Sequence, residues 1–266
     1  MIGFFDSGVG GLSILRVVQR MMPKISTVYF GDTKNFPYGT KTEDQVRQCS
    51  LRAVEVLMKY KPSAIVVACN TASTSAISSI REHVPHIPVI GVVPALKPAV
   101  SMTKTKNIAV LATERTLESK SYQELKKTFD GQVTIIDQAC PGWVDAVESC
   151  KIKDGGLDNT VERLKIKDGD TEELVREVIQ PLVGREVDTF VLGCTHYPFL
   201  RPLIERYAGT SAQILDSGEA VARQLQRVVG KNIDDEPRPE IFLTSGDPEH
   251  FAAQASALLH RKVMVG

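Results

Sequence analysis

Two short stretches, AIVVACNTAS (Ala64 to Ser73) and TFVLGCTHYP (Thr189 to Pro198), share one pattern and decide the fold of this 266-residue chain. In each, a largely apolar run with β-branched residues ends in one small residue and a cysteine, and polar residues follow at once. Such a run is typical of a buried parallel strand. Ligands of open α/β sheets bind at the carboxyl ends of the strands. The two stretches therefore predict that Cys69 and Cys194 lie where a substrate binds.

Strand and helix patterns alternate along the rest of the chain, which predicts parallel βαβ units. In the first half we expect further strands at residues 2–5, 27–32 and 88–93, and helices at 12–22, 44–60 and 74–84. The pattern then begins again, with strands expected at 107–113, 132–141 and 212–218 and helices at 116–129 and 171–183. A last strand at 241–246 and a helix at 248–260 follow. This repetition indicates a duplicated α/β half with the two cysteines at equivalent positions.

The positions of prolines indicate the boundary between the two halves. Prolines interrupt the pattern between Pro94 and Met102, and the final segment is expected to fold back onto the first half. We therefore expect a first domain of residues 1–96 plus 208–266 and a second of residues 97–207. The polar segment Lys151 to Asp170 is expected to be a surface excursion of the second half.

Composition narrows the class of protein. The 32 basic and 32 acidic residues cancel, and no Lys/Arg cluster is dense enough for a nucleic-acid partner. No apolar run approaches the roughly 20 residues that span a membrane, and the amino terminus does not resemble a secretory signal. Five cysteines are an odd number in so long a chain, so we expect reduced thiols and a cytoplasmic location rather than a disulfide framework.

The two thiols suggest acid–base chemistry if they face one cleft: one removes a proton from one face of a carbon and the other returns a proton to the opposite face. A thiol has a pKa of about 8.5, so each needs a neighbour that handles its charge or proton. His196 is the candidate beside Cys194, and Asp6 is the candidate beside Cys69. The alternatives are that the cysteines are small buried hydrophobes, that His196 is a hydrogen-bonded loop residue, and that Asp6 or Ser7 caps a helix.

Other residues carry weaker signals. Gly8, Gly10 and Gly11 permit close approach to a ligand, but neither dinucleotide- nor phosphate-loop spacing is present. Cys-x-His without a second ligand pair is a weak metal signal, so no metal is expected. The polar side chains of Asn70, Thr71 and Thr195 suit a carboxylate or an ammonium. Cys49, Cys140 and Cys150 are interpreted as structural, and Trp143 as a core or interface residue.

Five motifs in order give the chain a family resemblance: DSGVGG at Asp6, FGDTKNFPYG at Phe30, ACNTAS at Ala68, GVVP at Gly91 and LGCTHYPFL at Leu192. Together they resemble the glutamate racemases, cofactor-independent amino-acid racemases of bacterial cell-wall synthesis. ILDSGEAVA and FLTSGDPEHF extend the likeness over nearly the whole chain. The resemblance implies two similar α/β domains with mostly parallel sheets, related by pseudo-twofold symmetry, with the active site in the cleft between them. It also implies glutamate as substrate, no cofactor and a homodimer.

The resemblance further implies residue roles. Cys69 and Cys194 are the two acid/base thiols, the first deprotonating D-glutamate and the second L-glutamate, and Asp6 and His196 assist them. Glu148 matches an acidic position that lies near the second thiol in some members, although the residues after it, Ser149 and Cys150, depart from the family pattern. The positions matching substrate-holding residues are Asp6, Ser7, Pro37, Tyr38, Gly39, Asn70, Thr71, Thr113, Thr116, Thr195 and His196.

Three other functions stay open from the residues. An aspartate racemase would use the same fold and thiols, and comparing the two substrates would separate it. A catalytically silent amino-acid-binding protein would lose no turnover when its thiols are alkylated. A hydrolase with Cys194 as nucleophile and His196 as base would form an acyl-enzyme and leave Cys69 without a role.

Overall fold

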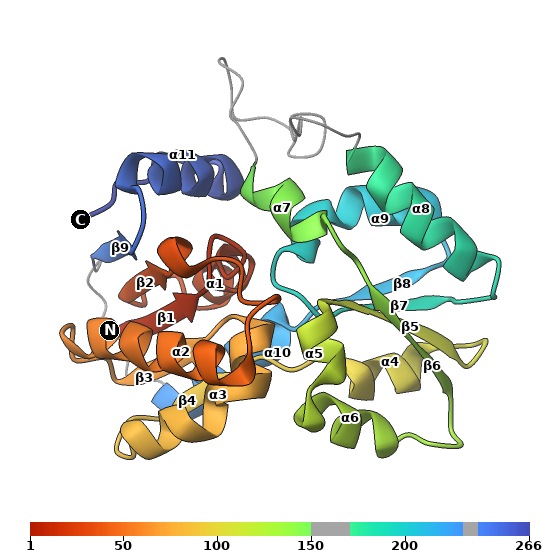
Figure 1. Cartoon of the computed structure of the whole chain (residues 1–266), viewed down its shortest axis with the longest axis horizontal. Coiled ribbons are helices and arrows are strands. Elements are labelled where there is room, and N and C mark those ends of the chain that lie inside the picture. The colour runs from red at the N-terminus through yellow and green to blue at the C-terminus, as the bar shows by residue number, and fades with distance from the viewer. Residues whose placement is uncertain (150–170, 231–238) are drawn as a thin grey trace.

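The computed structural model describes residues 1–149, 171–230 and 239–266, which form two sheets (Figure 1). Cys150 and the excursion expected at Lys151 to Asp170 lie outside the described residues. The first sheet has the order β4-β3-β1-β2-β9, with bounds Val89–Gly91, Ala64–Val67, Ile2–Asp6, Thr27–Gly31 and Glu240–Thr244. The second has the order β6-β5-β7-β8, with bounds Thr134–Ala139, Asn107–Ala112, Thr189–Leu192 and Gln213–Leu215.

All strand pairings within these two sheets are parallel, and the order confirms the predicted duplication. When the second sheet is written as β8-β7-β5-β6, it repeats the order β4-β3-β1-β2 of the first. The strand β9 is the addition that makes the first sheet larger. The expected α/β class with two similar halves is therefore confirmed, and the two cysteine strands, β3 and β7, occupy equivalent places.

Helices cover both faces of each sheet, as buried parallel strands require. On the first sheet, α1 (Leu12–Met21), α10 (Gly218–Val229) and α11 (Pro248–Leu259) pack on one face, and α2 (Glu43–Met58) and α3 (Asn70–His83) on the other. On the second, α4 (Leu96–Met102), α5 (Glu114–Glu118) and α6 (Lys120–Lys127) share one face. The opposite face carries α7 (Trp143–Glu148), α8 (Thr171–Val183) and α9 (Arg201–Ala208). Two short 3₁₀ helices, Thr33–Asn35 and Tyr197–Leu200, follow β2 and β7.

The helix boundaries correct three expectations. The helix α3 begins at Asn70 rather than Thr74, because Cys69 itself is the N-cap and its sulfur accepts from the backbone N–H of Ala72. The single helix expected at 116–129 is two helices, since extended backbone at Ser119 ends α5 and its side chain caps α6. The helices α4, α7, α9 and α10 were not expected, although α10 has apolar residues at helical spacing (buried Val221, Ala222 and Leu225).

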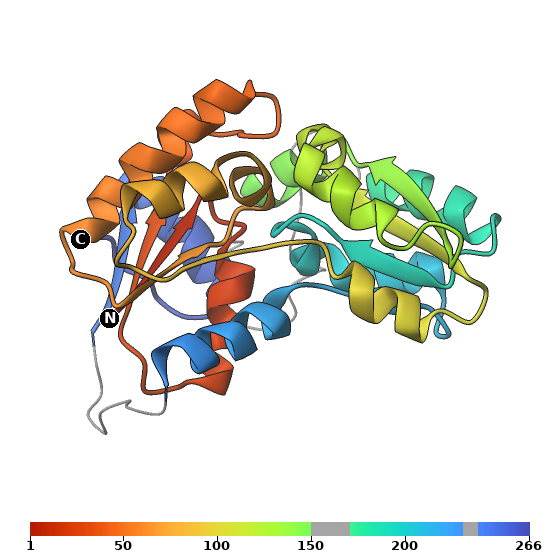
Figure 2. The same cartoon turned by 90° about the horizontal axis from the view of Figure 1, so that it is seen from below.

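The chain crosses between the halves twice, between β4 and α4 and between β8 and α10 (Figure 2). One strand departs from the expected domains: β8 at Gln213–Leu215 pairs with β7, so part of the segment 208–266 belongs to the second sheet. The Ser217 hydroxyl donates to the Val93 carbonyl and joins the two crossings. We propose that the second crossing, near Ser217, rather than residue 208, is where the first domain resumes.

One hydrophobic cluster connects the halves. It includes Phe4 and Leu15 from the first half and Trp143, Phe190 and Tyr197 from the second, all of them fully buried. Trp143 is a core residue, as one of the two interpretations of it held, and its indole N–H donates to the Leu174 carbonyl. Within the described residues, no helix is both long and apolar enough to cross a membrane.

Candidate active site

The carboxyl ends of both sheets meet at one cavity of about 250 Å³ between the halves. Its walls contain residues that follow β1, β2 and β3 in the first half and β5, β6 and β7 in the second. This confirms the cleft that the resemblance implies. Of the expected site residues, those that line it are Ser7, Pro37, Tyr38, Gly39, Cys69, Asn70, Thr71, Thr113, Cys194, Thr195 and His196. Asp6, Thr116 and Glu148 lie behind this wall.

Cys69 lies at the amino end of α3, in a tight and weakly polar setting. Its sulfur is 3.5 Å from the Ala72 backbone nitrogen and 3.7 Å from the Ser7 hydroxyl, to which its S–H donates. Burial, and secondarily the charge of Asp6, raises the pKa of Cys69 to about 12. The α3 N-terminus and Ser7 act in the opposite direction by hydrogen bonding to the sulfur. Without a ligand, Cys69 is therefore a protonated thiol.

Cys194 has a different set of neighbours, which we call the Cys194 side: Cys194, His196 and Glu148. The sulfur is 3.6 Å from Nδ1 of His196, and Nε2 of the same ring is 2.7 Å from Oε1 of Glu148. Burial opposes charge on this imidazole, but the hydrogen bonds and negative charge of Cys194 and Glu148 raise the pKa of His196 well above its usual 6.5. A protonated imidazole donates through both nitrogens, so it faces the sulfur with a cationic donor.

Asp6 contacts Thr195, the residue after Cys194, as well as acting on Cys69. It is fully buried, accepts from the Gly8 backbone N–H at 2.8 Å, and accepts from the Thr195 hydroxyl at 3.1 Å. Burial raises the pKa of Asp6, while the charge of His196 and the Gly8 hydrogen bond lower it. Asp6 therefore couples the first half to the loop that carries Cys194, in addition to its electrostatic effect on Cys69.

The glycine loop after β1 approaches protein side chains, which explains its composition. A Cβ placed on Gly8 would collide with the carboxylate of Glu148, and one on Gly10 would collide with the His196 ring. The Val9 backbone N–H donates to Glu148 at 2.8 Å. These glycines were expected to let the backbone approach a ligand, whereas in the structure Gly8 lies against Glu148 and Gly10 against His196.

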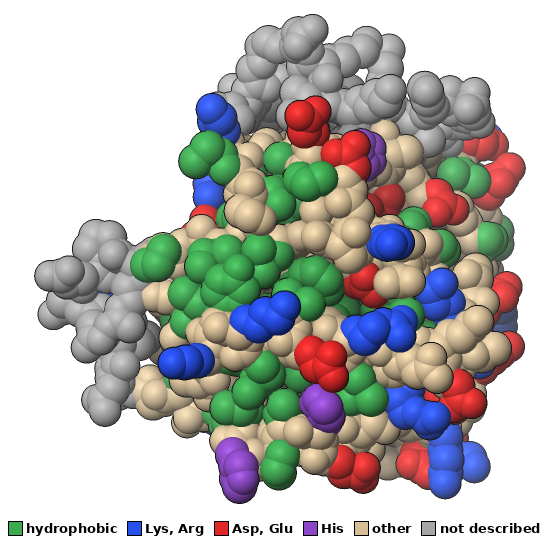
Figure 3. Space-filling model, turned by 60° about the vertical axis from the view of Figure 1, so that its left-hand side comes forward, with side chains coloured by type: hydrophobic (Ala, Val, Ile, Leu, Met, Phe, Trp, Pro, Cys, Tyr) green, Lys and Arg blue, Asp and Glu red, His purple; other side chains and the backbone are tan. Residues whose placement is uncertain are grey.

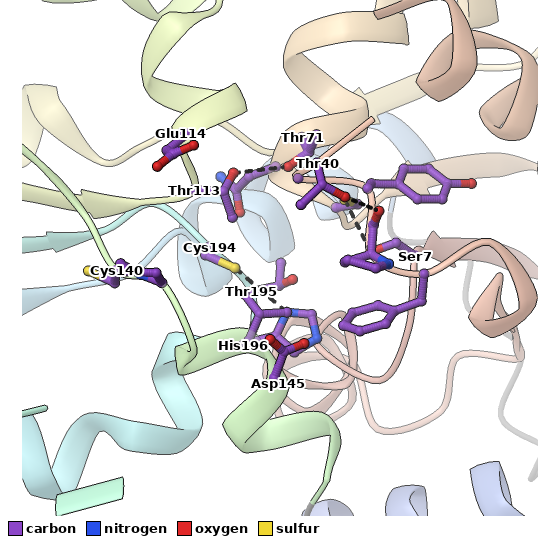
Figure 4. A pocket seen from close by; sticks show the side chains of 18 of the residues that line it. Ser7, Thr40, Thr71, Thr113, Glu114, Cys140, Asp145, Cys194, Thr195 and His196 are labelled. Carbon is purple, nitrogen blue, oxygen red and sulfur yellow. Dashed lines mark hydrogen bonds between the residues drawn. The ribbon is translucent and has the colours of Figure 1, made fainter. Parts of the chain in front are cut away.

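Hydroxyl and amide groups complete the wall opposite the sulfurs. Thr71 from α3 meets Thr113 from the second half at 3.2 Å, and Thr113 meets the buried Thr116 at 3.0 Å. Among the described residues, Nδ2 of Asn70 is a buried amide nitrogen without an acceptor, and Asn70 lines the cavity. A buried unpaired donor at a cavity wall indicates a ligand acceptor. Figure 4 shows Ser7 and Cys194 on opposite sides of the pocket.

Sequence reasoning missed part of the wall. The end of β6 and the residues after it line the cavity on the second-half side, namely Ala139, Cys140, Pro141, Gly142, Val144 and Asp145, and Phe36, Thr40 and Glu114 line it too. Cys140, interpreted as only structural, forms part of this wall, because it directly follows β6 as Asp32 follows β2. The repeat itself was the signal: the loop after β2 was expected at the site, so its counterpart after β6 belongs there too.

Among the described residues that line the cavity there is no Lys or Arg, so these residues would hold an anionic ligand by neutral donors and by the α3 N-terminus. In the described ranges, no three His, Cys, Asp or Glu side chains gather as metal ligands. What the cavity does offer is the buried thiol of Cys69 from the first half, those of Cys194 and Cys140 from the second, and short polar groups. This defines the class: a duplicated α/β protein with paired thiols arranged for acid–base chemistry on a small ligand.

Comparisons with known proteins agree with that class. The sequence matches the Asp/Glu/hydantoin racemase family over residues 12–225. It is 37% identical to a glutamate racemase of Ectopseudomonas mendocina over 99% of this chain and 96% of that one, and 40% identical to one of Herpetosiphon aurantiacus over 94% of each. The structure superposes on a glutamate racemase of Bacillus anthracis with a TM-score of 0.84 and 31% identity, covering 100% of this chain and 96% of that one.

A second solved structure, of the Escherichia coli glutamate racemase with L-glutamate and the activator UDP-MurNAc-ala, also gives a TM-score of 0.84. It is 28% identical and covers 99% of this chain and 96% of that one. The chain belongs to the Asp/Glu/hydantoin racemase family.

Proposed function

We propose that this chain interconverts L- and D-glutamate, with Cys69 and Cys194 as the two acid/base groups, and that it supplies D-glutamate for peptidoglycan synthesis. The observation that carries the mechanism is the convergence of Cys69 and Cys194, which follow the equivalent strands β3 and β7 of the two halves, on a single cavity. Full-length relatives named glutamate racemase support the substrate, as does the bound L-glutamate of the Escherichia coli relative.

The reaction needs one thiolate and one thiol. The thiolate takes the α-proton from one face of glutamate, which leaves a carbanion, and the opposing thiol returns a proton to the other face. The α-proton is very weakly acidic, so positioned proton transfer, worth about 10²–10⁴-fold, is insufficient alone. Preorganised donors around the carboxylate and exclusion of water supply the remainder.

The neutral donors of the cavity suit the carboxylates of glutamate. The unpaired Nδ2 of Asn70 and the first backbone N–H groups of α3 are directed to the same wall. A carboxylate there would receive hydrogen bonds and the favourable end of the helix dipole. The hydroxyls of Ser7, Thr71 and Thr195 would add further donors, and the carboxylate of Asp6 would favour the ammonium nearby.

Solvent exchange tests the proposal. The reduced protein, treated with chelator and freed of cofactors, is incubated in D₂O with L-glutamate and separately with D-glutamate. Loss of optical rotation with deuterium entering the α-position is the expected result, and L-aspartate run in parallel distinguishes the aspartate racemase. Absence of exchange from both enantiomers of both amino acids, in folded protein, would favour a binding protein instead.

The Cys194 side also resembles the nucleophile–base–carboxylate arrangement of cysteine hydrolases, which favours the hydrolase alternative more than the sequence did. That alternative leaves the equally placed Cys69 unused. Mass spectrometry separates the two, because a hydrolase would gain the mass of an acyl group on Cys194 during turnover, whereas a racemase would not.

We also propose a homodimer and a cytoplasmic location, as the resemblance implies. Hydrophobic side chains with Lys and Arg beside them gather on the outer face of the first half, which makes this face a candidate contact surface (Figure 3). Sedimentation velocity over a range of concentrations measures the mass directly. A single species at the mass of one chain would exclude the dimer.

A further inference from the structure

Gln254 lies on α11 in the first half, yet its side chain reaches the second half beneath the candidate site. It is 2% exposed, and its amide nitrogen donates a hydrogen bond to the backbone carbonyl of Glu148. Phe251, one turn earlier, packs its ring 6.1 Å from the ring of Tyr29, which fixes α11 on the first half. Gln254 therefore extends from a well-anchored helix to the residue whose carboxylate contacts His196.

The carbonyl that Gln254 contacts belongs to a helix end that needs a partner. The helix α7 has six residues and ends at Glu148. The last four carbonyls of any helix lack partners within it, and so short a helix is not stable on its own. Because Gln254 satisfies the carbonyl of Glu148, it fixes the end of α7 from outside.

The position of that end decides where the Glu148 carboxylate lies. Oε1 of Glu148 is 2.7 Å from Nε2 of His196, whose other nitrogen is 3.6 Å from the sulfur of Cys194. A shift of α7 would lengthen the first contact and turn the ring away from the sulfur. The first half also contacts the loop that carries His196, because the Ser13 hydroxyl on α1 donates to the Thr195 carbonyl at 2.8 Å.

We propose that Gln254 is a positioning residue for the Cys194 side: by holding the Glu148 carbonyl, it lets the first half set the orientation of His196 at the second thiol. The inference rests on the proposed racemase function. It assigns Gln254 no contact with substrate and no effect on the Cys69 thiol, whose neighbours are Ser7 and α3.

The two enantiomers of β-chloroglutamate separate the two thiols. Removal of the α-proton by a thiolate expels chloride from the β-carbon with the electrons of the C–H bond. The resulting enamine tautomerises to the imine, and water converts that to α-ketoglutarate and ammonium. No second proton transfer to the α-carbon's opposite face is needed, so chloride release reports Cys194 for the L enantiomer and Cys69 for the D enantiomer.

In Gln254→Met, which keeps the length of the side chain and removes the donor, chloride release from the L enantiomer should fall about tenfold, the effect of one lost hydrogen bond. Release from the D enantiomer should stay within about twofold, well below the tenfold that one hydrogen bond is worth. Gln132→Met is the matched control, because Gln132 donates to the Thr128 carbonyl near the end of α6, away from the cavity. It should change neither rate.

Equal loss for both enantiomers, or no loss for either, would overturn the inference. If Gln254→Met does not fold, as judged by its melting temperature, Ser13→Ala gives the same test from the other anchor point, and it too should slow the L enantiomer selectively. A wild-type chain that releases chloride from neither enantiomer and does not racemise glutamate contradicts the proposed function itself. That result is seen before any variant is made.

Discussion

The two thiols occupy equivalent places in a duplicated fold, but they have different chemical surroundings. Cys69 caps a helix and has a hydroxyl and a backbone N–H as neighbours. Cys194 faces an imidazole that is itself held by a carboxylate. Duplication therefore fixed where the sulfurs lie, while the loops that follow β3 and β7 diverged in how each sulfur is supported. The comparison teaches that two similar halves can place equivalent sulfurs in unlike chemical surroundings.

Removing one sulfur at a time is the strongest test of whether both thiols are needed. Cys69→Ser and Cys194→Ser should each lower racemisation by about 10³-fold or more, because a serine hydroxyl is far less acidic than a thiol and does not ionise near neutral pH to act as the base. Polarimetry of L- and D-glutamate measures the loss. Cys49→Ser is the matched control, since Cys49 is buried in α2, is not among the residues that line the cavity, and should leave the rate unchanged. Normal racemisation by either site variant would contradict the two-thiol assignment.

Removing the neighbours of each sulfur tests how strongly those neighbours support it. His196→Asn should lower kcat by about 10²-fold, because it removes the titratable partner of Cys194. Ser7→Ala should cost only about threefold, since the Ser7 hydroxyl lies 3.7 Å from the Cys69 sulfur and contributes one weak hydrogen bond. Steady-state kinetics in both directions measures these effects. Equal losses in the two variants would mean that the two sulfurs are supported equally.

Asn70, in the polar part of the cavity wall, should affect substrate binding more than the rate of proton transfer. Asn70→Asp replaces the unpaired donor by an acceptor, which places a carboxylate against the carboxylate of glutamate. KM should rise about tenfold or more from this repulsion, with a smaller change in kcat. Asn107→Asp is the control, because the Asn107 amide contacts the Arg185 carbonyl at the opposite end of β5. An unchanged KM in Asn70→Asp would place the substrate elsewhere in the cavity.

A last prediction concerns stability at high pH rather than activity. The folded Cys69 has a pKa raised to about 12 from an ordinary value near 9, first by burial and then by the charge of Asp6. Between these values the folded protein keeps a proton that the unfolded chain has lost. The stabilisation is complete below pH 9 and is lost as the pH rises toward 12, by at most about 1.4 kcal/mol per pH unit.

Chemical denaturation from pH 8 to pH 11 measures this slope, and the test compares wild type with Cys69→Ala. The variant should show a smaller decline. Other groups contribute to what remains, among them Cys140, whose pKa burial also raises. Identical slopes would mean that Cys69 titrates normally in the folded protein.

Much of this could be predicted from the sequence because it depends on local patterns. The strands before Cys69 and Cys194 are short apolar runs, and parallel sheets place the residues after them at one edge. Contacts made between distant segments gave no such signal. Nothing in the α11 sequence indicates that Gln254 meets Glu148, and nothing near Gly8 or Gly10 indicates that side chains of the other half fill the space above them. The proposed domain boundary near Ser217 also rests on contacts between distant segments, the pairing of β8 with β7 and the hydrogen bond from Ser217 to Val93.

The position of β9 has a consequence for the biosynthesis of the protein. The β2 edge of the first sheet pairs with β9, which the ribosome makes only after the entire second sheet. Until then the nascent first half exposes an unpaired strand, the kind of edge that recruits other chains into aggregates. The second sheet does not depend on a strand that is made much later, because its strands follow one another in a single stretch of the sequence. We expect a translational pause or a chaperone to matter most while residues 92–239 emerge.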